Sequence, residues 1–193
     1  MDSSTTMEKK QKIRKKTHPK KFGMWIAIGS ILMMFAGFTS AYIVRRSQGN
    51  WLKFDLPIHF YISTVLVLLS SLTIWWAAKA YKKKSMYQTS LAITAVLGIL
   101  FAVFQYLGFS KIFEQITWNN NVSLQYLLVI IAVHAIHILG GVIALIVMSL
   151  KTIGMNMDYD PKKENVNLTI MSTYWHFVGI LWIYLFIFFI LNP

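Results

Sequence analysis

The sequence predicts an all-α membrane protein, folded as a bundle of five transmembrane helices. Hydrophobic residues make up 56% of the 193 positions, and charged residues only 13%. A composition this apolar is typical of chains that remain in lipid. Five runs without Lys, Arg, Asp or Glu are long enough to cross about 30 Å of hydrocarbon as helices. Short alternating segments, which would indicate membrane-spanning strands, do not occur.

The five predicted spans follow one another along most of the chain. The first cannot be a cleaved signal peptide, because it is too long and too aromatic and lacks a cleavage site of small residues. Each of the others also has the roughly 20 residues that a transmembrane helix needs. We place the spans near Phe22–Val44, Ile58–Ala78, Gln88–Ser110, Leu124–Leu150 and Ser172–Leu191.

The basic residues predict the orientation of the bundle. Of the 19 Lys and Arg residues, 15 precede the first span or lie in the second and fourth connections. The remaining four, which belong to the other side, are Arg45, Arg46, Lys53 and Lys111. The positive-inside rule therefore places the N-terminus in the cytoplasm and the C-terminus outside. We expect residues 1–21 to form a flexible basic tail and residues 22–193 to form the membrane domain.

The net charge of +12 has a simple interpretation in a membrane protein. A basic segment next to a membrane span fixes topology and lies against anionic lipid headgroups. We therefore expect no nucleic-acid partner. The chain contains no cysteine, which excludes disulfides, thiolate metal sites and iron–sulfur clusters.

No acidic side chain lies inside any predicted span. Ion pumps and proton-coupled transporters place ionisable groups at depth, so the sequence disfavours both classes of protein. The seven acidic residues all belong to the tail or the connections: Asp2, Glu8, Asp55, Glu114, Asp158, Asp160 and Glu164.

The polar side chains left at depth include Gln105 in the third span and three histidines. His134 and His137 are three residues apart in the fourth span and share a helix face, and His176 lies in the fifth. One interpretation is ligation of a heme or metal, or quinone binding, by these histidines. A metal site would lack the carboxylates that usually orient histidine ligands. We therefore favour hydrogen bonds between helices as the role of the three histidines, and no metal or redox cofactor in this chain.

Small and aromatic residues predict where helices meet each other and the lipid interface. Ala36 and Gly37, with Ser40 and Ala41, predict close helix packing in the first span, as does Gly140-Gly141 in the fourth. Tryptophans at span ends are expected to be interfacial anchors. These are Trp25, Trp75, Trp76 and Trp175 at the inner side and Trp51 and Trp118 at the outer side.

Each span carries a short motif, and the order of the motifs is specific. They are Gly23-Met24-Trp25 with Phe35–Tyr42 and Arg45; Ser63-Thr64 with Leu68–Ser71; Gln105; His134-Ala-Ile-His137 with Gly141; and Tyr174-Trp175-His176-Phe177-Val178 with Trp182. From Gly23 to the C-terminus, this series resembles subunit III of the heme-copper cytochrome c oxidases. The five spans resemble the short bacterial form, which lacks the first two of the family's seven helices.

The chain departs from the family pattern at three acidic positions. Ile31 stands where the family usually has a buried glutamate, Gly108 where a glutamate commonly follows the glutamine, and Gly179 where aspartate follows the Tyr-Trp-His-Phe-Val motif. Family roles that depend on these carboxylates, such as help with proton uptake, are therefore not expected here.

The resemblance implies a function in aerobic respiration. It implies an accessory subunit without redox centres, packed against oxidase subunit I, which holds the hemes and copper, and accompanied by subunit II. It also implies ordered phospholipids bound to the subunit and a place in the bacterial cell membrane. Membership of a larger respiratory supercomplex is left open by the sequence. The electron donor, cytochrome c or quinol, is a property of another subunit.

Overall fold

The structure is a computed structural model that describes residues 19–47, 49, 55–80, 83–115, 122–154 and 161–192. The side chains of a few residues at helix ends lie outside this description. The described residues form five α-helices and no strand. In chain order they are α2 (Pro19–Arg46), α3 (Ile58–Ala80), α4 (Lys84–Gln115), α5 (Val122–Gly154) and α6 (Pro161–Leu191).

All five helices are long and apolar enough to cross a membrane. The shortest, α3, has 23 residues and the longest, α5, has 33. A rise of about 1.5 Å per residue makes even α3 longer than the roughly 30 Å of hydrocarbon in a bilayer. The predicted all-α, five-span, multi-pass membrane fold is therefore confirmed.

The helices extend beyond the predicted spans, most of all at the start of α6. This helix begins at Pro161, whereas the sequence analysis placed the span from Ser172. Hydropathy marks only the part of a helix that lies in lipid, and polar residues continue it into the aqueous layer. Proline suits the first position of a helix, where its missing N–H group would have no helical partner.

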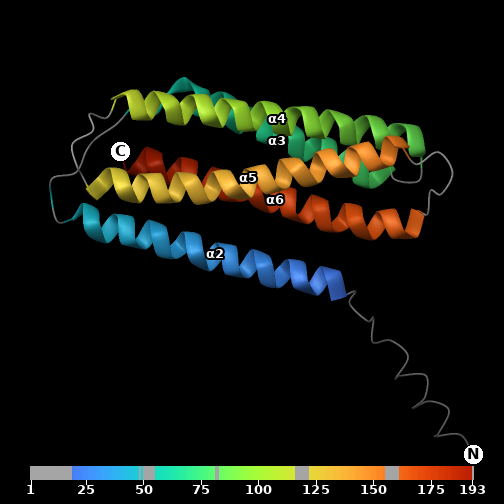
Figure 1. Ribbon diagram of the computed structural model, residues 1–193, viewed down its shortest axis with the longest axis horizontal. Coiled ribbons are helices and arrows are strands. Elements are labelled where there is room, and N and C mark those ends of the chain that lie inside the picture. The colour runs from blue at the N-terminus through green and yellow to red at the C-terminus, as the bar shows by residue number, and fades with distance from the viewer. Residues whose placement is uncertain are drawn as a thin grey trace, which may run out of the picture.

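The helices run side by side in alternating directions, with α5 and α6 in the middle (Figure 1). The pair of α3 and α4 packs on one side of them, and α2 lies on the other. Among the described residues, α2 contacts α5 and α6 but neither α3 nor α4. The C-terminus lies at the end of the bundle opposite the start of α2 (Figure 1). The helix α2 is thus the peripheral member of the bundle.

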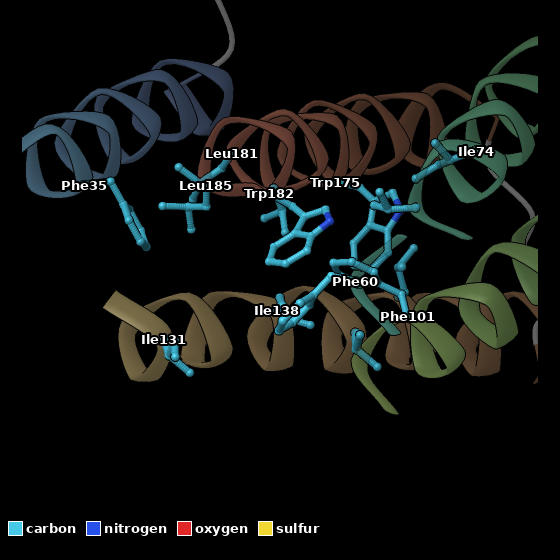
Figure 2. Packing of buried hydrophobic residues seen from close by; sticks show 14 of the residues in the cluster. Phe35, Phe60, Ile74, Phe101, Ile131, Ile138, Trp175, Leu181, Trp182 and Leu185 are labelled. Carbon is cyan, nitrogen blue, oxygen red and sulfur yellow. The ribbon is translucent and has the colours of Figure 1, made fainter. Parts of the chain in front are cut away.

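Large aromatic side chains fill the space between the helices. Phe35, Phe60, Phe101, Trp175 and Trp182 come from four different helices and are all buried (Figure 2). Lipid is as apolar as the core of the bundle, so the burial of these rings does not by itself bring the helices together. Close packing and hydrogen bonds hold the helices together instead.

Trp175 is not the interfacial anchor that the sequence analysis predicted. Its side chain is fully buried. It lies about four helical turns from the start of α6 and faces the core of the bundle, whereas an interfacial anchor would be exposed. Trp25, Trp75 and Trp76 do lie exposed on the outside of the bundle, whereas Trp51 and Trp118 are outside the described residues.

The small residues of α2 do not make the predicted close helix contact within this chain. A Cβ atom built on Gly37 meets no atom within 4 Å, and Ala36 and Ser40 are exposed. These residues face outward because the side of α2 turned to the bundle is the one that carries Phe35, Thr39 and Tyr42.

Candidate functional site

Two buried tryptophans of α6 donate hydrogen bonds to hydroxyl groups of α3. The indole N–H of Trp175 lies 2.6 Å from the Oγ of Ser70. About two turns further along α6, the indole N–H of Trp182 lies 2.9 Å from the Oγ1 of Thr64. An indole N–H can only donate and needs a partner when it is buried, so these two bonds fix the register of α6 against α3.

A third hydroxyl of α3 accepts a hydrogen bond from α4. The Nε2 of Gln105 lies 3.1 Å from the Oγ of Ser63, and both side chains are buried. The hydroxyls of Ser63 and Thr64 in turn donate to the carbonyl of Phe60 in their own helix, at 2.9 and 2.7 Å. Each of these two hydroxyls thus uses its proton within α3 and accepts one from another helix. The Oε1 of Gln105 has no hydrogen-bond partner among the described residues.

Two glycines make room for the ring of Trp175. A Cβ atom on Gly98 would lie 2.9 Å from the ring, and one on Gly141 would lie 3.1 Å from its other edge. Gly141 is also close to Tyr174, whose ring would lie 3.2 Å from the added atom. The predicted site residues Gly141, Tyr174 and Trp175 therefore lie together, and the role of the glycine is close helix approach.

Tyr174 joins α6 to α5. Its hydroxyl donates to the backbone carbonyl of His137 at 3.0 Å. The ring of His137 makes its own contact within α5, with Nδ1 2.7 Å from the carbonyl oxygen of Val133. The bond between the two helices therefore involves the backbone at His137 and not the imidazole.

His134 contradicts the predicted hydrogen bond between helices. Its ring is fully buried, yet neither ring nitrogen has a hydrogen-bond partner among the described residues. The ring stacks instead on Trp182, with centroids 5.4 Å apart and planes inclined by 20°. Phe35 meets it edge-on at 6.3 Å.

The three histidines do not form a ligand set. His134 is buried, whereas His137 and His176 are only partly buried. In the described part of the chain, no group of three or more His, Asp or Glu side chains is arranged to hold a metal ion. The alternative of heme or metal ligation by His134, His137 and His176 is therefore not favoured.

The structure describes all three positions at which the resemblance implies an acidic residue. A Cβ atom on Gly108 would lie 2.7 Å from the ring of Phe60, so that ring occupies the space of a longer side chain. A Cβ atom on Gly179 would lie 3.4 Å from Val67 and 3.6 Å from the hydroxyl oxygen of Ser71, which are ordinary contact distances. Ile31 is partly buried and packs against the core.

The sequence analysis missed a polar contact between α2 and the end of α6. Thr39 and Tyr184 share a hydrogen bond of 2.7 Å. Near the C-terminus, the guanidinium of Arg46 donates to Oδ1 of Asn192 at 2.9 Å, and the hydroxyl of Tyr42 donates to the Asn192 backbone carbonyl at 3.1 Å. We call these three bonds the α2 clasp. A polar asparagine directly after a long apolar run was the available signal in the sequence.

Two other predicted site residues lie on α2 away from the core. Trp25 is 65% exposed near the start of the helix. Arg45 is partly buried in its last turn. The predicted site residues thus fall into two groups: Gln105 and the residues of α5 and α6 that pack in or beside the core, and two residues on the peripheral helix.

Comparison with known proteins agrees with the motif series. The sequence pattern of cytochrome c oxidase subunit III matches residues 51–192. Subunit 3 of the cytochrome bo(3) ubiquinol oxidase of Buchnera aphidicola subsp. Acyrthosiphon pisum is 28% identical over 182 residues, which cover 90% of this chain and 86% of that protein.

Two further relatives are named as cytochrome c oxidase subunits. A probable cytochrome c oxidase subunit 3 of Nocardia farcinica is 28% identical over 177 residues, covering 85% of this chain and 83% of the relative. The corresponding protein of Rickettsia felis is 31% identical over 138 residues, covering 70% of this chain and 47% of the relative. The chain therefore belongs to the cytochrome c oxidase subunit III family.

Proposed function

We propose that this chain is an accessory subunit of a heme-copper terminal oxidase, the respiratory complex that reduces oxygen to water. In this proposal it stabilises the catalytic subunit and contains no redox centre. One observation carries the proposal. Gln105, Tyr174, Trp175 and Trp182 all donate hydrogen bonds to other helices of the same bundle. Side chains used in this way support a rigid scaffold.

The partners in this proposal are oxidase subunits I and II in the bacterial cell membrane. Subunit I would hold the hemes and copper. The outward face of α2 supports contact with a partner helix, because Gly37 and Ser40 are small and lie uncovered by this chain. Small residues let neighbouring helices approach closely in a membrane. Bound phospholipid and a larger supercomplex belong to the same proposal.

The proposal includes an orientation, with the N-terminus in the cytoplasm and the C-terminus outside. The distribution of basic residues supports this orientation. A reporter enzyme that is active only in the periplasm, fused after Pro193, should be active. Cytoplasmic activity of a reporter at the same position would contradict the orientation.

Deletion of the subunit tests the proposed role. We expect the oxidase to keep most of its initial turnover at neutral pH but to lose activity sooner during sustained turnover. The measurements are oxygen consumption over time and the heme and copper content per catalytic subunit, with the restored gene as control. A loss of heme or copper in proportion to the lost subunit would show that this chain carries a redox centre and would overturn the proposal.

A further inference from the structure

A groove lies between α4 and α5, in the half of the bundle where α4 ends and α5 begins. Figure 1 shows this half on the left, where the end of α4 and the start of α5 lie. The volume of the groove is about 320 Å³. The sequence analysis did not identify this groove, although Gln105, which belongs to the motif series, is one of the residues that line it.

The groove is closed toward the core and open toward the outside of the bundle. On its inner wall Gln105 is only 3% exposed, and Phe109 and Ile138 are also buried. At its mouth Tyr106 and Leu139 are 73% and 54% exposed. Both helices are long and apolar enough to span the membrane, so a ligand reaches this mouth through lipid. The ligand is therefore a membrane-soluble molecule.

The side chain of Gln105 brings an unpaired acceptor to the inner wall. Its Nε2 donates to the Oγ of Ser63 at 3.1 Å. The Ser63 hydroxyl uses its own proton toward the carbonyl of Phe60, at 2.9 Å, so it accepts from the amide and cannot donate to it. The Oε1 of Gln105 is buried and has no partner among the described residues. A buried acceptor of this kind is stabilised by a ligand that brings a hydrogen-bond donor.

The surroundings of this acceptor exclude an ion and a lone water molecule. None of the described residues that line the groove is charged. Lys111, on the same helix, already forms an ion pair with Glu114 at 2.6 Å. A buried water makes about three hydrogen bonds, but the other buried side chains of the wall are apolar. A neutral molecule with one donor and an apolar body is complementary to this wall.

The size and shape of the groove select a flat ring. Ala102 of α4 and Ala135 of α5 are small side chains on the two walls, and the rings of Phe109 and Phe113 also line the space. Ligand pockets range from about 300 to 1,000 Å³, so this one lies near the lower limit and suits one ring system. A phospholipid with two acyl chains is too large for it. Aromatic rings favour an aromatic ligand, through stacked or edge-on contacts.

We propose that this groove binds the ring of a membrane-soluble quinol in its reduced form. One ring hydroxyl donates to the Oε1 of Gln105, the ring lies against Phe109 and Phe113, and the tail leaves through the mouth beside Leu139. Because Oε1 is covered by its neighbours, binding includes a side-chain shift, as is common at binding sites. The oxidised quinone carries carbonyl oxygens in place of hydroxyls and has no donor for this acceptor.

This site goes beyond the proposed function, because it gives the accessory subunit a ligand of its own. It does not involve the three histidines of α5 and α6, and no electron is transferred in it. The subunit holds the reduced carrier without reacting with it.

Anaerobic photolabelling of the intact oxidase in lipid nanodiscs tests the site. The probe is a short-tailed benzoquinol with a diazirine on its tail, and mass spectrometry locates the label in the peptides of this chain. We expect label within residues 102–113 and 131–139, and competition by the same quinol without the diazirine. The dimethyl ether of that quinol keeps the ring and tail but has no O–H group. It should compete about fivefold less well, the effect of losing one hydrogen bond.

Two variants with matched controls separate the acceptor from the space. Gln105→Leu should weaken competition by the quinol about fivefold. Ser63→Ala breaks the same bond between α3 and α4 but keeps Oε1, so it should retain the wild-type affinity. Ala135→Phe fills the groove and should abolish the label, whereas Ala132→Phe, on an exposed part of α5 outside the groove, should retain it.

Four results would overturn the site. These are equal competition by the quinol and its dimethyl ether, equal weakening in Gln105→Leu and Ser63→Ala, label spread equally over the exposed faces of α2 and α3, and a cross-link from Tyr106→Cys to another oxidase subunit. The label is counted on the peptides of this chain, and the subunits that accompany the chain are counted separately. Failure of the quinol site and failure of the proposed function are therefore distinguishable.

Discussion

The helices α6 and α2 are both apolar spans, but they are held in the bundle in different ways. Half of the residues in the membrane stretch of α6 are buried within the chain, against 17% in that of α2. The core face of α6 carries Trp175 and Trp182, which combine large rings with a hydrogen-bond donor. The helix α2 buries only Phe35, Thr39 and Tyr42. Apolar composition brings a helix into the membrane, but its place in the bundle depends on large side chains with a polar group.

The first way to test this comparison is to remove one large ring from each helix. Trp175→Ala should lower the free energy of unfolding by about 3 to 5 kcal/mol, because it leaves a cavity and removes the donor to Ser70. Trp25→Ala on α2 should change it by less than about 0.5 kcal/mol, since Trp25 is 65% exposed. Titration of the purified chain with a denaturing detergent measures both. Equal losses in the two variants would contradict the difference between the helices.

The second test adds one methyl group at a glycine. Gly108→Ala should destabilise the chain by about 1 to 3 kcal/mol, because the new Cβ would lie 2.7 Å from the ring of Phe60. Gly37→Ala is the control on α2, where no atom lies within 4 Å of the new group. This control should stabilise the helix slightly, as alanine usually does relative to glycine. The same unfolding titration applies, and destabilisation by Gly37→Ala would show that this face of α2 is covered.

The third test loosens the α2 clasp. Hydrogen bonds between membrane helices contribute about 0.6 kcal/mol each. Thr39→Val/Arg46→Gln should therefore raise the hydrogen-exchange rate of the α2 amides by about sevenfold without changing α6. Ser30→Ala is the control, because the Ser30 hydroxyl bonds only to the carbonyl of Ile26 in its own helix. Equal acceleration in α2 and α6 would show that the two helices unfold together.

The smallest effect is expected at His137. His137→Ala removes a contact within α5 but leaves the carbonyl that accepts from Tyr174, so it should cost less than about 1 kcal/mol. Tyr174→Phe is the comparison variant, because it removes the bond between the helices. Heme and copper per catalytic subunit, measured on the intact oxidase, should stay unchanged in both variants. A fall in either metal would support a ligand role for His137.

The length of the apolar runs was sufficient to predict the five helices, because lipid requires backbone hydrogen bonds within each segment. The motif series also located the residues that join the helices, since Gln105, Tyr174, Trp175 and Trp182 all belong to it. Their partners were harder to predict. A side chain's neighbour on another helix depends on the rotation and register of both helices, and these follow from the packing of the whole bundle.

The predictions for two residues, Trp175 and His134, were wrong. Trp175 was expected to be an interfacial anchor because it lies near the start of an apolar run, but its ring is fully buried between the helices. His134 was expected to bond to another helix because buried polar groups usually do. The structure gives its ring aromatic neighbours instead. Nothing in the spacing of His134 and His137 distinguishes a stacked imidazole from a hydrogen-bonded one.

The hydroxyl groups of α3 also bear on how the chain is made. Trp175 lies 105 residues after Ser70, and Trp182 lies 118 residues after Thr64. At a synthesis rate of about 5 to 20 residues per second, α3 spends roughly 5 to 25 s in the membrane before the indoles exist. During this time the hydroxyl of Thr64, which later accepts from Trp182, can donate to the Phe60 carbonyl of its own helix, as it does in the finished fold.

An indole N–H, in contrast, has no such local acceptor. The order of synthesis therefore delivers first the groups that can satisfy their own donors, and last the groups that need a partner already in place. If the tryptophans were on the earlier helix and the hydroxyls on the later one, two indole N–H groups would remain in lipid without a hydrogen-bond partner until the later helix had been synthesised.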